Sequence, residues 1–238
     1  MIKICTFSDG HGYLPEITEG FDLILLGGDN VSLDCQSSKI LTREWYMNEF
    51  VEWINKLPFN DFRSKVVFIC GNHEVGFQRQ SLTEVNDLIA SIKQLTNDRI
   101  VYLQNEQYTF WKGDEHITIF GTPYCKIFGR WAYNETQESL NNLYSKMPED
   151  CDILLSHDAP YGVSDLCYGW INWDRSLEHI GNQALRDAIL EKKPKYNIHG
   201  HLHTTNHEFE QLGDTQVVCV SLLDEAYKVV YKPLYLEL

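Results

Sequence analysis

The chain has 238 residues, of which 43% are hydrophobic and 23% charged, a balance typical of packed globular proteins rather than of disordered or fibrous ones. Its formal net charge of −14 would repel duplex DNA and other long polyanions, so small substrates are favoured over polynucleotides. The seven cysteines are scattered and include no CxxC pair, which argues against a disulfide framework and fits a reducing, cytoplasmic setting.

No linker, repeat or low-complexity stretch divides the chain, and its length requires only one hydrophobic core. We therefore predict a single domain over residues 1–238. The N-terminal segment MIKICTFSDGHG lacks the long apolar run and small-residue cleavage site of a signal peptide. No segment approaches the roughly 20 apolar residues that a membrane-spanning helix needs, so we expect an uncleaved protein without a membrane partner.

Short apolar runs that end in potential metal ligands recur five times along the chain. The runs are 2–7 followed by Ser8-Asp9-Gly10-His11, 21–26 followed by Gly27-Gly28-Asp29-Asn30, 66–70 followed by Gly71-Asn72-His73-Glu74, 151–155 followed by Ser156-His157-Asp158, and 196–199 followed by Gly200-His201-Leu202-His203. Continuous apolar runs are typical of strands buried on both faces, and ligands of open α/β sheets bind at the carboxyl ends of such strands. We expect the five ends to converge on one crevice.

Amphipathic patterns predict helices over 41–57 and 82–95, and further helices are expected over 135–146 and 180–192. Additional strands are expected at 107–111, 117–120, 216–221 and 228–236, the first two joined by a turn at Gly113-Asp114. Helices alternate with strands in the first part of the chain, and strands pair in the last part. This order indicates a layered α/β fold.

The five strand ends together supply the ligands that two metal ions need. Two divalent ions about 3.5–4 Å apart require a bridging carboxylate, with imidazole and carbonyl oxygen ligands completing each shell. Asp9 and His11 are two residues apart and can point to one side of an extended segment. Two glycines before Asp29 let its carboxylate come close to the ions. The remaining donors are one amide and three imidazoles, those of Asn72, His157, His201 and His203.

The ordered motifs of residues 1–205 resemble the signature of the calcineurin-like metallophosphoesterases. They are Asp9-Gly10-His11, Gly28-Asp29, Gly71-Asn72-His73-Glu74, His157 and Gly200-His201-Leu202-His203. The resemblance implies two mixed β-sheets packed face to face and flanked by helices, in four layers. It also implies that Asp29 bridges two ions, the first held with Asp9, His11 and His203, and the second with Asn72, His157 and His201.

The resemblance further implies a metal-dependent hydrolase of phosphoric esters, in which metal-bound hydroxide attacks phosphorus and His73 protonates the leaving group. A narrower likeness, over 119–124, 131–134 and 157–160, is to small metallophosphoesterase-domain proteins regarded as phosphodiesterases. Two divalent ions, two aspartates and one hydroxide leave a net charge of about +1, which suits a phosphodiester monoanion. We expect a phosphodiesterase acting on a small or cyclic-nucleotide-like substrate, with a phosphomonoesterase as the alternative. Manganese, iron, zinc and nickel suit these ligands equally well.

Departures from the family pattern bear on the substrate and on the other function classes. Ser/Thr protein phosphatases carry an arginine shortly after the Asp of the second motif, whereas Asn30-Val31-Ser32 follows Asp29, so a phosphoprotein substrate is disfavoured. Asp158 follows His157 where the family commonly has a Gly-Pro-Pro-like stretch, which predicts a carboxylate near the second ion. A non-catalytic scaffold would have lost ligands that are present here. A nuclease would need a basic groove, in contrast to the 20 basic and 34 acidic residues.

Several residues near the motifs are expected to act structurally or as part of the rim. Glu74 should orient its loop and Asn30 should shape a turn. We predict structural roles for His116, His179, His199 and His207, and burial as small hydrophobes for Cys5, Cys70 and Cys219. Segment 161–179 lacks an obvious strand pattern and is a candidate rim. The aromatic residues that could stack on a nucleobase, or instead fill the core, are Tyr124, Phe128, Trp131, Tyr133, Trp170 and Trp173.

Overall fold

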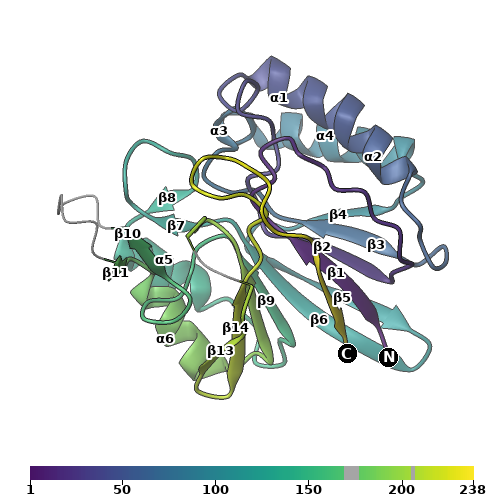
Figure 1. Cartoon of the computed structure of the whole chain (residues 1–238). Helices are drawn as coiled ribbons and strands as arrows, with labels where there is room; N and C mark the ends of the chain where they lie inside the picture. Colours follow the sequence, from purple (N-terminus) through teal and green to yellow (C-terminus); the bar gives the residue numbers. More distant parts are fainter. Residues whose placement is uncertain (169–176, 205–206) are drawn as a thin grey trace.

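The structure is a computed structural model that describes residues 1–168, 177–204 and 207–238. Two mixed β-sheets pack face to face, and helices cover the outer face of each (Figure 1). The four-layer fold predicted from the sequence is therefore confirmed.

The first sheet has the strand order β15-β1-β2-β3-β4. Its first four strands along the chain run parallel, and the last pairs antiparallel with β1. The bounds are β1 (Lys3–Phe7), β2 (Leu23–Leu26), β3 (Lys65–Phe68), β4 (Ile100–Tyr102) and β15 (Leu234–Glu237). Alternate side chains of β2 face opposite ways: Leu23 and Leu25 pack against the second sheet, whereas Ile24 and Leu26 pack under the helices. Burial on both faces explains the continuous apolar run in its sequence.

The second sheet has the strand order β13-β14-β12-β9-β6-β5. Its four central strands run parallel and its two edge strands pair antiparallel with their neighbours. The bounds are β5 (Glu106–Lys112), β6 (Glu115–Thr122), β9 (Ile153–Ser156), β12 (Tyr196–His199), β13 (Glu210–Leu212) and β14 (Thr215–Cys219). Helices α5 (Gln137–Tyr144) and α6 (Gln183–Lys192) cover its outer face, where Leu140 and Leu185 pack in one cluster with Phe120 and Leu154.

Helices over the first sheet follow the predicted positions. The helix expected over 41–57 is a continuous segment with a π-helical turn in the middle, made of α1 (Lys39–Trp45), η1 (Tyr46–Phe50) and α2 (Val51–Asn55). Helix α4 (Leu82–Leu95) has the predicted bounds. It begins with a capping box, in which the Ser81 hydroxyl accepts from the Glu84 N–H and the Glu84 carboxylate accepts from the Ser81 N–H. The short helix α3 (Val75–Gln78) was not predicted.

The strand expected over 228–236 is wrong for most of its length, since only Leu234–Glu237 pairs with β1. Residues 228–233 make only an isolated bridge, between Val229 and Leu223, and the turn before them is held by the Asp224 carboxylate, which accepts hydrogen bonds from the N–H groups of Ala226 and Lys228. Two short strand pairs were also missed. They are β7 (Cys125–Lys126) with β8 (Asn134–Glu135), and β10 (Leu166–Tyr168) with β11 (Leu177–His179) within the candidate rim.

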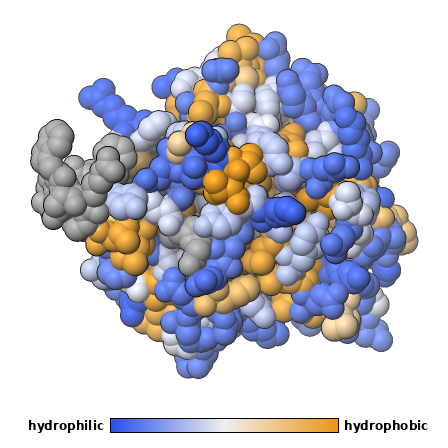
Figure 2. All heavy atoms as spheres, viewed as in Figure 1, coloured by the Kyte–Doolittle hydropathy of each residue, from blue (hydrophilic) through white to orange (hydrophobic). Residues whose placement is uncertain are grey.

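The cysteine positions agree with the sequence prediction, and the face shown in Figure 2 is mostly hydrophilic, as expected for a chain with a net charge of −14. Cys5, Cys70 and Cys219 are fully buried, as expected for small hydrophobes, and the seven cysteines, which all lie in the described part of the chain, form no disulfide bonds with one another. Apolar residues on the face shown in Figure 2 form separate patches among hydrophilic ones. Among the described residues, the helices are too short or too polar to cross a bilayer.

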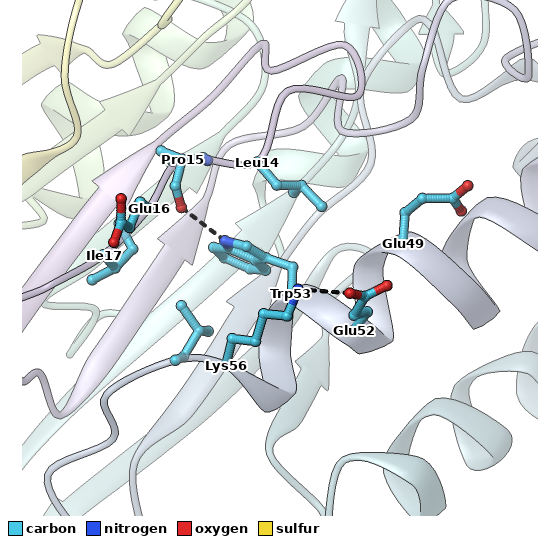
Figure 3. Close-up of a pocket in the computed structure, with 9 residues that line it drawn as sticks. Leu14, Pro15, Glu16, Ile17, Glu49, Glu52, Trp53 and Lys56 are labelled. Carbon is cyan, nitrogen blue, oxygen red and sulfur yellow. Dashed lines mark hydrogen bonds and ion pairs between the residues drawn. The ribbon is translucent and has the colours of Figure 1, made fainter.

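A groove of about 460 Å³ lies between the loop that contains Pro15 and the helical segment that contains Trp53 (Figure 3). The Trp53 indole N–H donates to the Pro15 carbonyl at 2.8 Å and so attaches the loop to helix α2. Acidic side chains, among them Glu16 and Glu49, line much of it. The residues predicted to bind metal are absent from its lining within the described part of the chain.

Candidate metal centre

The predicted ligands follow strands of both sheets and meet where the carboxyl ends of those strands approach each other. Strands β1, β2 and β3 supply the ligands of the first sheet, and β9 and β12 those of the second. Hydrogen bonds between backbone and side-chain groups tie the two sets together: the His201 N–H donates to Asp9 Oδ2 at 2.9 Å, and the His157 imidazole Nδ1 to the Gly27 carbonyl at 2.8 Å. The expected crevice thus lies between two sheets rather than at the edge of one.

Glycine is required where the strand ends come closest. A Cβ atom on Gly71 would lie 2.3 Å from Asp29 Oδ1 and 2.4 Å from the His157 ring, and Gly28 has a φ of +101°. Side chains at these two positions would push the donor groups apart or strain the backbone. The glycines that precede the ligands in the sequence therefore allow the ligand groups to approach.

Four of the seven predicted ligands have a left-handed backbone, which non-glycine residues rarely adopt. The φ angles are 53° for Asp9, 43° for His11, 51° for Asp29 and 71° for His201. Each such residue costs of order 1–3 kcal/mol, and residues of this kind cluster at functional sites. The left-handed conformation turns these side chains out of the strand direction and toward the other predicted ligands.

The donor atoms form two groups that share Asp29. In the first group, His203 Nε2 lies 3.4 Å from Asp9 Oδ1 and 3.4 Å from His11 Nε2. In the second, His157 Nε2 lies 2.9 Å from Asn72 Oδ1. Asp29 Oδ2 lies 3.4 Å from His157 Nε2 and 3.9 Å from His11 Nε2, so it reaches a member of each group.

The remaining predicted ligand, His201, joins the second group. Its ring centroid lies 5.1 Å from that of His157. One nitrogen of each ring and the thiol of Cys125 lie within 4.8 Å of one another. All seven predicted ligands are thus close together in space.

The electrostatics of the centre fit a pair of cations. Burial alone would raise the pKa values of the Asp9 and Asp29 carboxyls, yet the neighbouring histidines hold both pKa values below the ordinary range. In the same way, burial opposes the charged imidazole, yet Asp29 raises the pKa of His157 to about 10 and Asp9 raises that of His203 to about 9. Two buried carboxylates need compensating positive charge, which divalent ions would supply.

Two other imidazoles are suited to bind as neutral donors. Burial lowers the pKa of His11 to about 4 and that of His201 to about 3. Metal ligation requires the neutral imidazole, so these rings need not lose a proton at neutral pH. The set of carboxylates, imidazoles and one amide oxygen fits manganese, iron, zinc or nickel.

His73 lies beside the donor atoms, with one ring nitrogen already engaged. Its Nδ1 is hydrogen-bonded to the Gln36 side-chain carbonyl, and its Nε2 lies 4.0 Å from Asp29 Oδ2. The Trp131 ring lies against it, tilted by 30°, with 4.5 Å between the ring centroids. Because the Gln36 carbonyl can only accept, Nδ1 carries a proton and Nε2 is left facing the centre.

Glu74 orients the loops that carry the ligands, in agreement with the role expected from the sequence. Its buried carboxylate accepts four backbone hydrogen bonds, at 3.1, 2.6, 3.0 and 2.6 Å, from the N–H groups of Asp29, Asn30, Val31 and Gly71. These bonds connect the loop after β2 to the loop after β3. Asn30 adds another such connection, since its amide donates to the Ile69 carbonyl.

We expect the substitution Glu74→Gln to destabilise the metal-free protein. Either orientation of the amide places an NH₂ group against two N–H donors, and each buried group left unsatisfied costs about 1–3 kcal/mol. Urea denaturation, analysed with one m-value for the variant and the unsubstituted protein, would measure the decrease in the free energy of unfolding. Glu49→Gln, at an exposed position, is the control and should change stability little. Equal stability of the two variants would contradict this role for Glu74.

The sequence did not reveal three residues at the centre. Gln36 and Tyr227 lie outside the strand-end pattern, and their positions depend on long-range contacts. Cys125 follows the end of β6, so it does fit the pattern of a strand followed by a donor and could have been found. Burial raises the pKa of the Cys125 thiol well above its ordinary range, so the thiol would have to lose its proton before it could bind a thiophilic ion such as zinc.

Asp158 does not point its carboxylate at the second group, contrary to the expectation. Its oxygens accept hydrogen bonds from the Lys126 and Ala159 N–H groups and from the Asn182 amide, at 3.0, 3.0 and 3.1 Å. The carboxylate therefore joins β7 to the start of α6. The sequence could not show this because each partner except Ala159 is distant along the chain.

The other histidines contact groups outside the ligand set. His199 is buried and bonds the Gly200 carbonyl, His207 bonds the Ser221 carbonyl, and His179 bonds the Asp165 carboxylate. His116 packs on Trp111 at the far edge strand β5. These contacts agree with the structural roles predicted for them.

The candidate stacking residues divide by exposure. Tyr133 is buried in the core, whereas Phe128 and Trp131 are partly exposed and contact the imidazoles of His201 and His73. Tyr124 is half-buried and packs against the core clusters. Trp170 and Trp173 lie outside the described residues.

Comparison with known proteins identifies the family. The family described as calcineurin-like phosphoesterase matches residues 2–205. Human metallophosphoesterase domain-containing protein 1 is 24% identical over 97% of this chain and 69% of its own length, and a UPF0046 protein of Caenorhabditis elegans is 26% identical over 96% and 76%. A Thermus thermophilus protein of known structure has a TM-score of 0.58 at 15% identity, over 92% of this chain and 88% of its own. The phosphopantetheinyl hydrolase of Mycobacterium tuberculosis has a TM-score of 0.54 at 12% identity, over 94% and 90%. The chain therefore belongs to the calcineurin-like phosphoesterase family.

Proposed function

We propose that this chain is a phosphodiesterase that acts on a small or cyclic-nucleotide-like substrate and uses two divalent ions. The observation that carries the proposal is the position of the Asp29 carboxylate, which reaches donors of both groups at 3.4 and 3.9 Å. Asp9, His11 and His203 would hold one ion with Asp29, and Asn72, His157 and His201 the other. When bound, such a pair supplies a nucleophile at neutral pH and neutralises charge on the phosphoryl oxygens.

The chain's own residues would handle the leaving group. His73 Nε2 faces the centre, while the Gln36 carbonyl accepts from Nδ1 and fixes the ring. Starting as the imidazolium, His73 would donate the Nε2 proton to the leaving oxygen and end as the neutral Nδ1–H tautomer. That tautomer keeps the Gln36 hydrogen bond intact, so the donation does not require the ring to move.

A diester is favoured over a monoester by charge. The ion pairs that Asp9 and Asp29 form in the described structure are with histidines, which fits a centre without the arginine of the protein phosphatases. The net charge of about +1 that the loaded centre would carry matches the single negative charge of a diester. A monoester dianion would carry an uncompensated charge in a protein whose net charge is already −14.

We therefore expect a higher kcat/KM for bis(p-nitrophenyl) phosphate than for p-nitrophenyl phosphate, which share a leaving group. One unit charge at 4 Å is worth about 1 kcal/mol in water and about 4 kcal/mol at an effective dielectric of 20, so a preference of about fivefold or more is expected. Cyclic nucleotides should also be cleaved. A clear preference for the monoester would instead establish the phosphomonoesterase alternative.

A further inference from the structure

Tyr227 contacts the candidate metal centre although it lies beyond residues 2–205, the part of the chain that the family matches. Its ring centroid is 4.9 Å from that of His11, 5.4 Å from that of His203 and 6.5 Å from that of His73. The side chain is nevertheless 44% exposed. A ring that touches three imidazoles of the centre and also faces solvent can contact a molecule that enters the site.

The turn that carries Tyr227 keeps its ring beside the candidate metal centre. Tyr227 has a φ of +57°, which is unusual for a bulky residue and costs of order 1–3 kcal/mol. Asp224 stabilises this turn through its carboxylate, which caps the N–H groups of Ala226 and Lys228, and through its carbonyl, which accepts from the Tyr227 N–H at 2.8 Å. Tyr133 shares the left-handed conformation, but it is buried, so core packing offsets its strain. The exposed Tyr227 has no such compensation.

The same turn is linked to a predicted ligand. The Asp224 carbonyl also accepts a hydrogen bond from His203 Nδ1 at 3.0 Å. This bond leaves His203 Nε2 facing Asp9 and His11. The Asp224 carbonyl therefore links the turn that carries Tyr227 directly to the predicted ligand His203.

A second exposed ring borders His73 from a different part of the chain. Trp131 is 39% exposed and lies 4.5 Å from the His73 ring at an interplanar angle of 30°. Its loop is attached to a predicted ligand, since the Ala132 N–H donates to the Asn72 carbonyl at 3.0 Å. Two aromatic rings on separate loops thus contact His73, the residue proposed to protonate the leaving group.

We propose that Tyr227 is a specificity-determining residue that, with Trp131, stacks on a planar aromatic leaving group. This inference rests on the proposed function, because it assigns these rings to the side of the substrate that His73 would protonate. Stacking of a base on an aromatic side chain contributes about 1–3 kcal/mol by alanine substitution. A nucleotide-like ester would provide a nucleoside leaving group, whose planar base could stack on these rings. If the rings served only to exclude water from the centre, the shape of the leaving group would not matter.

Two methyl phosphodiesters of similar leaving-group basicity, one with a phenyl and one with a hexafluoroisopropyl leaving group, separate these possibilities. Tyr227→Ala should lower kcat/KM for the phenyl ester by about 5-fold to 150-fold, with KM carrying part of the loss, and should change that for the fluoroalkyl ester by about twofold or less. Tyr227→Phe should keep the preference because the ring is retained. Tyr235→Ala, at a similarly exposed tyrosine on β15, is the matched control and should change neither.

Trp131→Ala should show the same discrimination, and it decides the question if Tyr227→Ala disturbs the turn and loses metal in elemental analysis. Equal losses for the two esters, in variants that keep their metal, would overturn the stacking role while leaving the proposed function intact. A metal-loaded wild-type protein that hydrolyses neither diester would overturn the proposed function itself and this inference with it.

Discussion

Asp29→Ala should abolish the binding of both metal ions and lower kcat/KM by about 10³-fold or more. The Asp29 carboxylate lies 3.4 Å from His157 and 3.9 Å from His11, so it reaches both donor groups, and its loss leaves each with an incomplete shell. Metal ions contribute several kcal/mol of charge stabilisation in the transition state, and each 1.4 kcal/mol is a factor of ten in rate. Elemental analysis after reconstitution, together with diester hydrolysis, measures both effects.

Asp22→Asn is a matched control because Asp22 is also a buried aspartate and lies at the other end of β2. Its carboxylate accepts from Lys112 Nζ at 2.7 Å and from the Lys3 N–H at 2.8 Å. The control should therefore lose stability but keep two metals per chain. If Asp29→Ala retained one ion at full occupancy, Asp29 would belong to one site and the shared-carboxylate arrangement would be wrong.

The strands of the layered α/β fold and the clustering of the candidate ligands could be predicted because their signals are local. A strand buried on both faces, such as β2, reads as an uninterrupted apolar run, and the donor that follows it marks the strand end. The helix bounds of α4 could be predicted for a similar reason, since Ser81 and Glu84 cap it within one turn. Each of these features depends on residues a few positions apart.

Several residues around the candidate ligands could not be predicted, because their positions depend on distant partners. Tyr227 lies between the strands expected over 216–221 and 228–236, and it is held at the centre by a turn whose Asp224 carbonyl accepts from His203, 21 positions away. Gln36 is brought to His73 by the packing of helix α1 and its loop, 37 positions away. Asp158 follows a predicted ligand in the sequence, yet its partners at β7 and α6 turn its carboxylate elsewhere.

His73→Ala should keep the fold and both metals while lowering kcat by about 10²–10⁴-fold for a substrate with an alkoxide leaving group. His73 is not one of the predicted ligands, although its ring lies within 4.8 Å of donor atoms of His11 and Asp29, and its Nε2 can donate a proton while Gln36 engages Nδ1. A nitrophenolate leaves without much help from an acid, so the loss should be much smaller for a p-nitrophenyl diester. Comparison of kcat for the two leaving groups, in protein of verified metal content, measures this difference.

His116→Ala is the control, since His116 packs on Trp111 at the edge strand β5 and should affect neither substrate. A His73→Ala protein that loses metal would show that this histidine supports the centre structurally. An equal loss for both leaving groups would show that His73 stabilises charge on the phosphoryl group instead of donating a proton. Only a loss that grows with the basicity of the leaving group fits the general acid, because the proton is transferred to that oxygen as its bond to phosphorus breaks.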